Sequence, residues 1–264
     1  MAVLSPGTLL QLMYLRERLG RISPGRFIEI GPGSGEVTQL LLDLGWTGQS
    51  YDLDAITIER LQIRFSKEIR ESEAYSVINA DYLTDSRLQE KVDLVISCMV
   101  MEHLDEKSES AFMKKSADSL KGNGLMIGFV PSSPAHWGIE DDIAGHCRRY
   151  TRQSIRDLME NCDWTISHLS GLTFPLSNWL LPISNFLVGR NERSKLNLSD
   201  LEKTKLSGRR NVKFKTHFPS LFGLILNRHM LLPLHVLQKA FKNSGRSLVI
   251  YFEAGPNLGG GPGK

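Results

Sequence analysis

A glycine-rich turn is the first stretch of this sequence whose residue types could do chemistry. It reads Glu29-Ile30-Gly31-Pro32-Gly33-Ser34-Gly35 and follows a short apolar run. Glycine leaves backbone N–H groups open to a ligand and adopts positive φ at little cost. Twenty-one residues beyond Gly31, Asp52 ends a second apolar run, where a carboxylate can accept hydrogen bonds from both hydroxyls of a ribose. Together they predict a site for a ligand that contains a nucleoside.

The spacing of the turn discriminates among such ligands. The dinucleotide fingerprint GxGxxG would place its third glycine at Glu36, whereas the spacing here is ExGxGxG. A carboxylate in the first turn of the following helix would repel a pyrophosphate at that helix N-terminus. A Walker phosphate loop is also absent. The remaining alternative, a turn that only packs a helix on a strand, leaves Asp52 unexplained.

A second group of reactive residues lies in the stretch GHCRRY, residues 145–150. It combines a titratable base, His146, with two cations, Arg148 and Arg149. A base that is positioned to remove the proton of a substrate hydroxyl accelerates a reaction by about 10²- to 10⁴-fold. His146 is therefore the candidate catalytic base. The alternative for His146 is a structural histidine bonded to backbone. The alternative for the two arginines is ion pairing with nearby acids, namely Glu140, Asp141 and Asp142.

Other histidines give weaker signals. His103, in the stretch MEHL, lacks the HExxH spacing of zinc proteases, and a structural role is favoured over catalysis. The spacings of His103, His136 and His146 match no metal motif, so no metal site is expected. The stretch SCMV at 97–100 differs from the DPPY-like sequence of enzymes that modify an amino group on a flipped DNA base, which argues against that substrate.

The elements that must position these residues alternate between strands and helices. Apolar runs predict strands at 27–31, 49–53, 75–80, 92–98, 125–130, 165–174 and 247–254. Amphipathic stretches predict helices at 8–20, 34–44, 55–70, 106–121 and 152–161. This order predicts an α/β fold with a Rossmann-like, mostly parallel seven-stranded sheet, helices on both faces and right-handed crossovers.

The same pattern divides the chain. We expect an N-terminal helix in residues 1–25, a core in 26–174, an insertion in 175–246, a last core strand at 247–254 and a flexible tail at 255–264. The insertion contains 13 Lys/Arg and 3 Asp/Glu, a net charge of +10, whereas the rest of the chain carries −7. The insertion is therefore expected to be a helical, basic cap that serves an anionic partner.

Composition excludes several protein classes. The 264 residues are 41% hydrophobic and 23% charged, which is typical of a globular protein and not of a disordered or collagenous one. The three cysteines, Cys98, Cys147 and Cys162, form no CxxC pair, and the first 20 residues lack the features of a signal peptide. A cytoplasmic location is the expectation. The uncharged stretch 169–189 contains two prolines and several polar residues, which make a poor membrane-spanning helix.

Five separately spaced stretches resemble one known family. They are EIGPGSG, the strand end YDLD, NADYL at 79–83, VDLVISCMVMEHL at 92–104 and LKGNGLMIGFVPS at 120–132. Together they resemble class I S-adenosylmethionine-dependent methyltransferases, in particular the small-molecule branch that includes the ubiquinone-type enzymes. The resemblance covers residues 27–174 and, more weakly, 247–254. GHCRRY is similar to a GHxRRY motif in a bacterial subgroup of these enzymes, many of which act on sugars or lipid-linked molecules.

The resemblance assigns roles to individual residues. It implies that Gly31, Gly33 and Gly35 border the methionine and ribose of S-adenosylmethionine, with Glu29 supporting the turn. The remaining implied cofactor contacts are Asp52 at the ribose, Leu53, Asp81 and Tyr82 around the adenine, and Cys98 and Met99 at the methionine end. Acceptors in this fold usually bind after the fifth strand, so Trp137, Arg148, Arg149 and Tyr150 are expected to bind substrate. His103, just beyond the fourth strand, is the fifth residue expected to do so.

The prediction from sequence is a methyltransferase acting on oxygen or nitrogen of a small molecule, either anionic or lipid-linked. The apolar and basic insertion is interpreted as a lid over that molecule, a peripheral contact with anionic lipid, or a plain folded cap. Two alternatives stay open. One is an RNA methyltransferase that uses the insertion to hold phosphates. The other is a regulatory protein that binds S-adenosylmethionine without catalysis.

Overall fold

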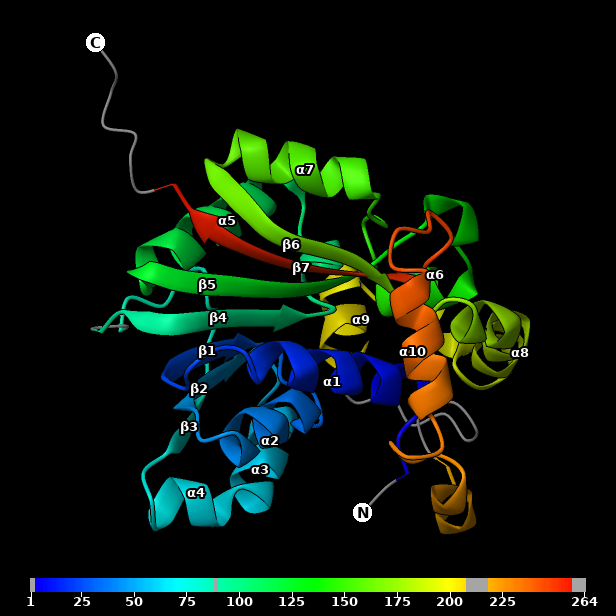
Figure 1. The fold of residues 1–264 in the computed structure, drawn as a ribbon, viewed down its shortest axis with the longest axis horizontal. Helices are drawn as coiled ribbons and strands as arrows, with labels where there is room; N and C mark the ends of the chain where they lie inside the picture. The colour runs from blue at the N-terminus through cyan, green and yellow to red at the C-terminus, as the bar shows by residue number, and fades with distance from the viewer. Residues whose placement is uncertain (1–2, 88–89, 208–217, 258–264) are drawn as a thin grey trace.

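The computed structural model describes residues 3–87, 90–207 and 218–257. Its centre is one seven-stranded sheet with the strand order β3-β2-β1-β4-β5-β7-β6 (Figure 1). The strands are β1 (Arg26–Ile30), β2 (Thr47–Asp52), β3 (Tyr75–Asn79), β4 (Val92–Cys98), β5 (Leu120–Pro131), β6 (Trp164–Leu172) and β7 (Val249–Pro256). Strands β1 to β5 pair in parallel, and β7 runs antiparallel between β5 and β6. The predicted fold class is confirmed.

Helices connect and cover the strands. The core helices are α1 (Pro6–Leu19), α2 (Glu36–Asp43), α3 (Ala55–Arg64), α4 (Ser66–Arg70), α5 (Glu106–Ser119), α6 (Ile139–Ala144) and α7 (Arg152–Asn161). Between β6 and β7 lie α8 (Leu176–Asn191), α9 (Asp200–Ser207) and α10 (Leu232–Ala240). Short 3-10 turns are η1 (Met101–His103), η2 (Pro134–His136), η3 (Arg193–Asn197) and η4 (Ser220–Leu224).

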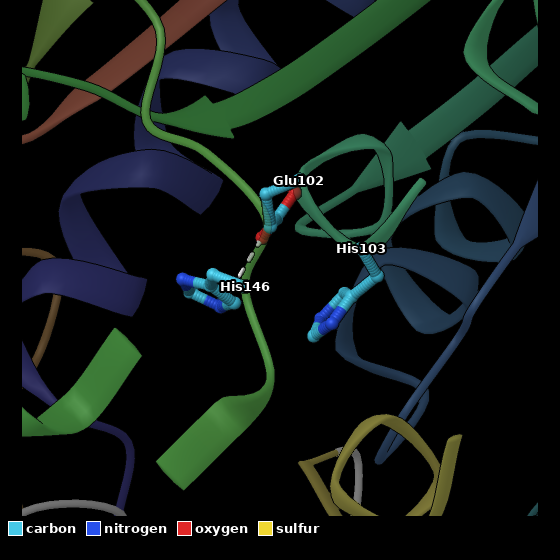
Figure 2. Close-up of side chains that lie close together, drawn as sticks. All are labelled: Glu102, His103 and His146. Atoms are coloured by element: carbon cyan, nitrogen blue, oxygen red, sulfur yellow. Dashed lines mark ion pairs between the residues drawn. The ribbon is translucent and has the colours of Figure 1, made fainter. Parts of the chain in front are cut away.

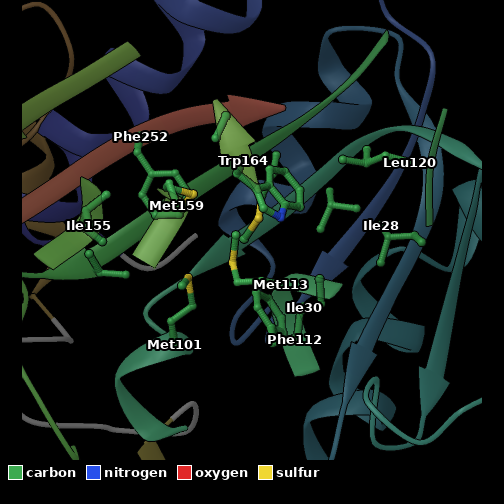
Figure 3. Close-up of a cluster of buried hydrophobic side chains, with 14 of the residues drawn as sticks. Ile28, Ile30, Met101, Phe112, Met113, Leu120, Ile155, Met159, Trp164 and Phe252 are labelled. Atoms are coloured by element: carbon green, nitrogen blue, oxygen red, sulfur yellow. The ribbon is translucent and has the colours of Figure 1, made fainter. Parts of the chain in front are cut away.

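Alternation along the strands divides the core into two layers. Phe27 of β1 is buried against α1, α2 and α3, whereas its neighbour Ile28 is buried on the opposite face with α5 and α7. Leu94 and Val95 of β4 divide in the same way, because successive strand side chains point to opposite faces. Figure 3 shows the second layer, where side chains from α5 and α7 meet β1 and β7. Both faces of the sheet are therefore covered by helices.

Four predicted segments differ in detail. The helix expected at 55–70 breaks at Phe65, which leaves helical geometry and buries its ring in the core. The helix expected to reach residue 121 ends at Ser119, because β5 already pairs with β4 at Leu120. Part of the expected loop after Pro131 forms η2 and α6. The last strand ends at Pro256 and not at 254, so the first residues of the expected tail belong to the sheet.

Strand order places the ligand-binding edge. The chain leaves β1 toward β2 on one side, and it leaves β4 toward β5 on the other. The carboxyl ends of β1 and β4 therefore flank a switch point, where open parallel sheets bind ligands. The insertion lies at this end of the sheet, with α8 and α10 beside α1 (Figure 1). Within the described residues, no helix has both the length and the apolar character to cross a bilayer.

Candidate active site

A cavity of about 1270 Å³ opens at the carboxyl ends of β1, β2 and β4. Its floor is the glycine-rich turn and the strand ends, one wall is the loop from α6 to Arg149, and the opposite side is the start of α1. Side chains of α8 and of the segment around η4 close it from above. The volume exceeds the usual 300 to 1000 Å³ of a single-ligand pocket, so two ligands can share it.

The glycines of the turn serve two purposes. Gly31 and Gly33 line the cavity with φ of 67° and 53°. A Cβ at Gly31 would stand 2.5 Å from a methyl of Val100, so no side chain fits there. Gly35 does not line the cavity. It precedes α2 with φ of 83°, and a Cβ there would collide with Phe65 and Leu61, so Gly35 allows the turn to pack closely on α3 and Phe65. Its contact with the cofactor stays a prediction.

Glu29 lies beneath the turn and is fully buried. Its Oε2 accepts hydrogen bonds from Thr38 and, at 3.1 Å, from Ser50. Burial raises the pKa of Glu29 to about 7, with the two hydroxyls acting against that shift. The side chain therefore joins α2 to β1 and β2, as support for the turn requires.

Two acids stand at the ends of neighbouring strands. Asp52 ends β2, and Asp81 follows β3, which pairs with β2. Each carboxylate orders its own loop, since Asp54 N–H donates to Asp52 at 2.8 Å and Leu83 N–H donates to Asp81 at 2.9 Å. Both acids line the cavity, as do Leu53 and Tyr82. The ring of Tyr82 is buried, with its hydroxyl 3.0 Å from Ser119.

Cys98 and Met99 line the cavity where β4 ends. Burial raises the pKa of the Cys98 thiol to about 12, so the thiol stays neutral. Met99 adopts φ of 57° while its N–H still donates to Phe129 of the neighbouring strand at 2.9 Å. The chain turns sharply here, and η1 follows directly.

The GHCRRY segment is fastened to η1 by backbone contacts. Cys147 N–H donates to the carbonyl of Glu102 at 2.7 Å, and the ring of His103 donates from Nδ1 to the carbonyl of Gly145 at 3.2 Å. Arg148 donates to the carbonyl of Leu104 at 3.1 Å. The two segments are more than 40 residues apart in the chain, and these bonds hold them together at the edge of the cavity.

Three of the five residues predicted to bind substrate do not line the cavity. Arg148 pairs with Glu109 of α5 at 2.8 Å. Tyr150 is buried and donates to the carbonyl of Met101 at 3.1 Å and also to Glu109. Trp137 donates to Asp142 at 2.9 Å and is half exposed. These contacts explain the motif as an anchor for the loop; only Arg149 and His103 of the predicted set line the cavity.

Asp141 organises the reactive part of the wall. Its Oδ1 accepts from His146 Nδ1 and from Arg149 Nε, both at 2.8 Å, and its Oδ2 accepts from Gly138 N–H at 2.9 Å. Burial opposes the charge of Asp141, but these hydrogen bonds prevail and lower its pKa to about 2. Because the carboxylate accepts from Nδ1, the imidazole of His146 keeps a lone pair on Nε2.

Glu102 faces that lone pair. Its Oε1 lies 3.8 Å from His146 Nε2, and neither carboxylate oxygen has a hydrogen-bond partner. The side chain is 0% exposed yet lines the cavity. Burial raises the pKa of Glu102 to about 7, with His146 acting in the opposite direction.

Glu102, His103 and His146 converge in Figure 2, each offering one atom within 4.8 Å of the others. This set could hold a metal ion. His136, considered with two of them from sequence, instead contacts Ser133 at 2.7 Å. No metal site was expected from the spacing of the histidines, but the structure brings together a candidate set of metal ligands.

Several cavity residues escaped the sequence analysis. They come from the start of α1, where Ser5, Thr8 and Gln11 line the cavity, and from Thr204 and Lys205 of α9. Nothing in their local pattern marks them, since each is an ordinary helix residue. Glu102 had a signal, because it follows the apolar residues Met99, Val100 and Met101, and burial of a carboxylate among apolar residues is costly unless it has a use.

Comparisons with known proteins agree with this geometry. Residues 9–169 match a family defined by a methyltransferase domain. The chain belongs to this family. The match spans the glycine-rich turn, both strand-end acids and the whole GHCRRY segment. The family resemblance noted from sequence is confirmed, and the GHxRRY subgroup stays a prediction. No curated protein gives a significant match to the sequence.

Solved structures share the fold of this methyltransferase. A protein from Bacillus halodurans assigned to the methyltransferases aligns with a TM-score of 0.57 at 13% identity, over 93% of this chain and 99% of its own. A glycopeptide N-methyltransferase, MtfA, gives 0.54 at 13% identity over 96% and 91%. The magnesium protoporphyrin IX methyltransferase of Synechocystis, crystallised with S-adenosylhomocysteine, gives 0.52 at 15% identity over 63% and 77%.

Proposed function

We propose that this methyltransferase transfers a methyl group from S-adenosylmethionine to oxygen or nitrogen of a small acceptor that has an apolar part, such as a lipid-linked molecule. One observation carries the proposal. A single cavity joins the strand-end acids to the Glu102–His146 wall, and apolar side chains of the insertion line its outer part. Cofactor and acceptor can therefore meet in one cavity.

The residues present fit the cofactor. Gly31 and Gly33 line the cavity without a side chain, so nothing at these two positions blocks the approach of a ligand to the backbone. We assign Asp52, which lines the cavity, to the ribose hydroxyls, and Asp81 to the adenine amino group. Bound there, S-adenosylmethionine would supply a methyl group on a positively charged sulfur, which is electrophilic without further activation.

The acceptor side needs to position a nucleophile and remove its proton. We assign that assistance to His146, whose Nε2 lone pair lies at the cavity wall and whose ring Asp141 orients. Arg149 shares Asp141 and so fixes the same carboxylate. Positioning in a closed site supplies much of the acceleration in a displacement reaction.

The lining of the upper cavity favours an apolar acceptor over RNA. The side chains that close it are mostly aliphatic or aromatic, namely Leu180, Leu181, Ile183, Leu187, Phe218, Phe222, Ile225 and Leu226. Burial of such surface favours a ligand at roughly 25 cal/mol per Å². The basic clusters Arg209-Arg210 and Lys213/Lys215, on which the RNA alternative depends, lie outside the described residues.

The outer face of the insertion supports a contact with lipid. Trp179 and Phe186 of α8 are each 66% exposed, and Leu221 and Leu224 of η4 are each 73% exposed. Large exposed apolar patches mark surfaces that bind another protein or a membrane. We expect the wild-type protein to sediment with anionic vesicles and the W179S/F186S variant to remain in the supernatant. Equal sedimentation of both would remove the lipid contact.

Incubation with radiolabelled S-adenosylmethionine and fractionated cell extract tests the proposed activity. We expect label in the organic phase, unaffected by RNase. Label that disappears on RNase treatment would establish the RNA alternative. Binding of S-adenosylhomocysteine with no labelled product from any fraction would favour the regulatory protein.

A further inference from the structure

Three metal-ligating side chains meet at the acceptor end of the cavity. Glu102 and His103 lie in or beside η1, and His146 follows α6, yet their ligand atoms all lie within 4.8 Å of one another (Figure 2). We propose that Glu102, His103 and His146 bind one divalent transition-metal ion. Because two ligands are adjacent in the chain and the third comes 43 residues later, no local motif marks the site.

The first reason to propose a metal ion is that the buried carboxylate of Glu102 has no hydrogen-bond partner. Its side chain is fully buried, and neither oxygen accepts a hydrogen bond. An unsatisfied buried polar group costs about 1 to 3 kcal/mol, and more when it is charged. Such groups are few in folded proteins, and each calls for an explanation. A cation bound from the cavity side would satisfy both oxygens.

The orientation of the two imidazoles is the second reason. His146 donates from Nδ1 to the Asp141 carboxylate at 2.8 Å, and His103 donates from Nδ1 to the Gly145 carbonyl at 3.2 Å. The ring of His146 therefore carries its lone pair on Nε2. The ring of His103 does so when its Nδ1 donates to Gly145, and the same Nδ1 also lies 3.2 Å from Oγ1 of Thr204. A carboxylate or carbonyl on the far nitrogen is the usual arrangement for histidines that bind metals, because it fixes the tautomer and raises the basicity of the ligand.

Charge and spacing fit a small cation. Asp141 pairs with Arg149, so the carboxylate of Glu102 supplies the negative charge of the ligand set. Ligands around an ion at 2.0 to 2.2 Å stand about 3.0 to 3.5 Å apart. The 3.8 Å between Glu102 Oε1 and His146 Nε2 requires only a small side-chain rotation to reach that range.

The donor set indicates the type of ion. Two imidazoles and one carboxylate suit Zn²⁺, Mn²⁺ or Fe²⁺, whereas Mg²⁺ and Ca²⁺ prefer oxygen ligands alone. Three protein ligands with open positions toward a cavity are typical of catalytic and not structural sites. The set lines the same cavity that holds the proposed acceptor.

A catalytic consequence rests on the proposed function. An acceptor hydroxyl in an open position of the ion would have a lowered pKa and would release its proton to water. His146 would then act as a ligand, whereas without an ion it acts directly as the base. The metal requirement of methyl transfer distinguishes these two roles.

Metal binding itself is tested without activity. Untagged protein, stripped with a chelator, is titrated with Zn²⁺ by calorimetry, and with Co²⁺ by visible absorption. We expect one ion per chain. E102Q and H146A should each weaken binding at least tenfold, and D141N, which changes the hydrogen-bond partner of His146 without removing a ligand, by about 10 to 100-fold. H136A is the matched control, since His136 lies nearby but outside the cluster, and it should bind as the wild type does.

A measurement on the wild type guards against variants that fail to fold. Zn²⁺ should shift the imidazole nitrogen resonances of two of the seven histidines. Absence of Zn²⁺ binding, shifts at other histidines, or undiminished binding by E102Q and H146A would overturn the site. Binding of S-adenosylhomocysteine by stripped protein reports on the cofactor pocket separately. Zn²⁺ bound at these residues without any methyl transfer would support the site while removing the proposed function.

Discussion

The two ends of the cavity are built in different ways. At the cofactor end, the polar residues follow strand ends directly, and each is ordered by backbone two residues away, as in Asp52 with Asp54 and Asp81 with Leu83. At the acceptor end, the partners are distant in the chain. His103 contacts Gly145 and Thr204, which are 42 and 101 residues away.

This difference teaches which part of such a site local sequence can specify. Strand ends of a parallel sheet converge whatever the loops contain, so a cofactor end needs only short motifs. The acceptor end depends on tertiary contacts between loops and on an insertion. Loops tolerate change more readily than the elements that they connect, so the acceptor end is free to vary.

Replacement of His146 should produce the largest effect and separate the two ends. H146A should lower kcat by about 10²-fold or more, because either the base or a metal ligand is lost. The affinity for S-adenosylhomocysteine should stay within twofold, because Asp52 and Gly31 are untouched. Steady-state kinetics and calorimetry check this, with H136A as control. An equal loss of cofactor affinity would show that the two ends are coupled.

The cofactor end should show its own dependence on pH through Glu29. Its folded pKa of about 7 lies above the ordinary value of 4.5. Between these values the folded state binds more protons than the unfolded one, so the free energy of unfolding falls as pH rises, by about 3 kcal/mol in all. This contribution is present below pH 4.5 and lost above pH 7.

Urea denaturation at pH 5 and pH 8 measures that loss. The wild type should lose more stability than E29Q between the two values, because glutamine does not titrate. The difference between the proteins isolates Glu29 from other titrating groups. If the wild type and E29Q lost the same stability between pH 5 and pH 8, Glu29 would keep its charge in the folded protein over this whole range.

Replacement of Asp52 should affect only the cofactor end. D52A should weaken binding of S-adenosylhomocysteine by about 1.5 to 3 kcal/mol, since charge-assisted hydrogen bonds to the ribose are lost. Calorimetry should show a dissociation constant roughly 10 to 150 times higher. D43A, at an exposed acid of α2 outside the cavity, is the control. Tight binding of NAD by wild type in place of S-adenosylhomocysteine would contradict the cofactor assignment.

The smallest effect should come from Tyr150, whose hydroxyl anchors the acceptor loop. Y150F removes the bonds to Met101 and Glu109 and should lower the free energy of unfolding by about 1 to 2 kcal/mol. The KM for the acceptor should not change. If Y150F instead raised the KM for the acceptor without changing stability, Tyr150 would contact the substrate, as predicted from sequence. It would then belong to the acceptor site together with His146.

The core could be predicted closely from sequence because its patterns are local. Strand β4 and helix α7 lie at their predicted residues, since a buried apolar run and a capped amphipathic stretch leave little choice. Phe65 shows the limit: its periodicity continues a helix, but burial of its ring against α2 and β3 breaks it there. The helices of the insertion could be anticipated only as a class, because prolines interrupt its apolar stretches, such as Pro182 inside α8 and Pro233 at the start of α10.

The sequence by itself determined the sheet, the glycine turn and the acids of the cofactor end, because these follow from short-range periodicity and from the convergence of strand ends. Only the tertiary structure decided which residues of GHCRRY face the cavity. In the tertiary structure, Arg148 and Tyr150 both contact Glu109, and His146 lies beside Glu102. Spacing along the chain cannot show this, because the distance between His146 and Glu102 depends on how two loops pack above the sheet.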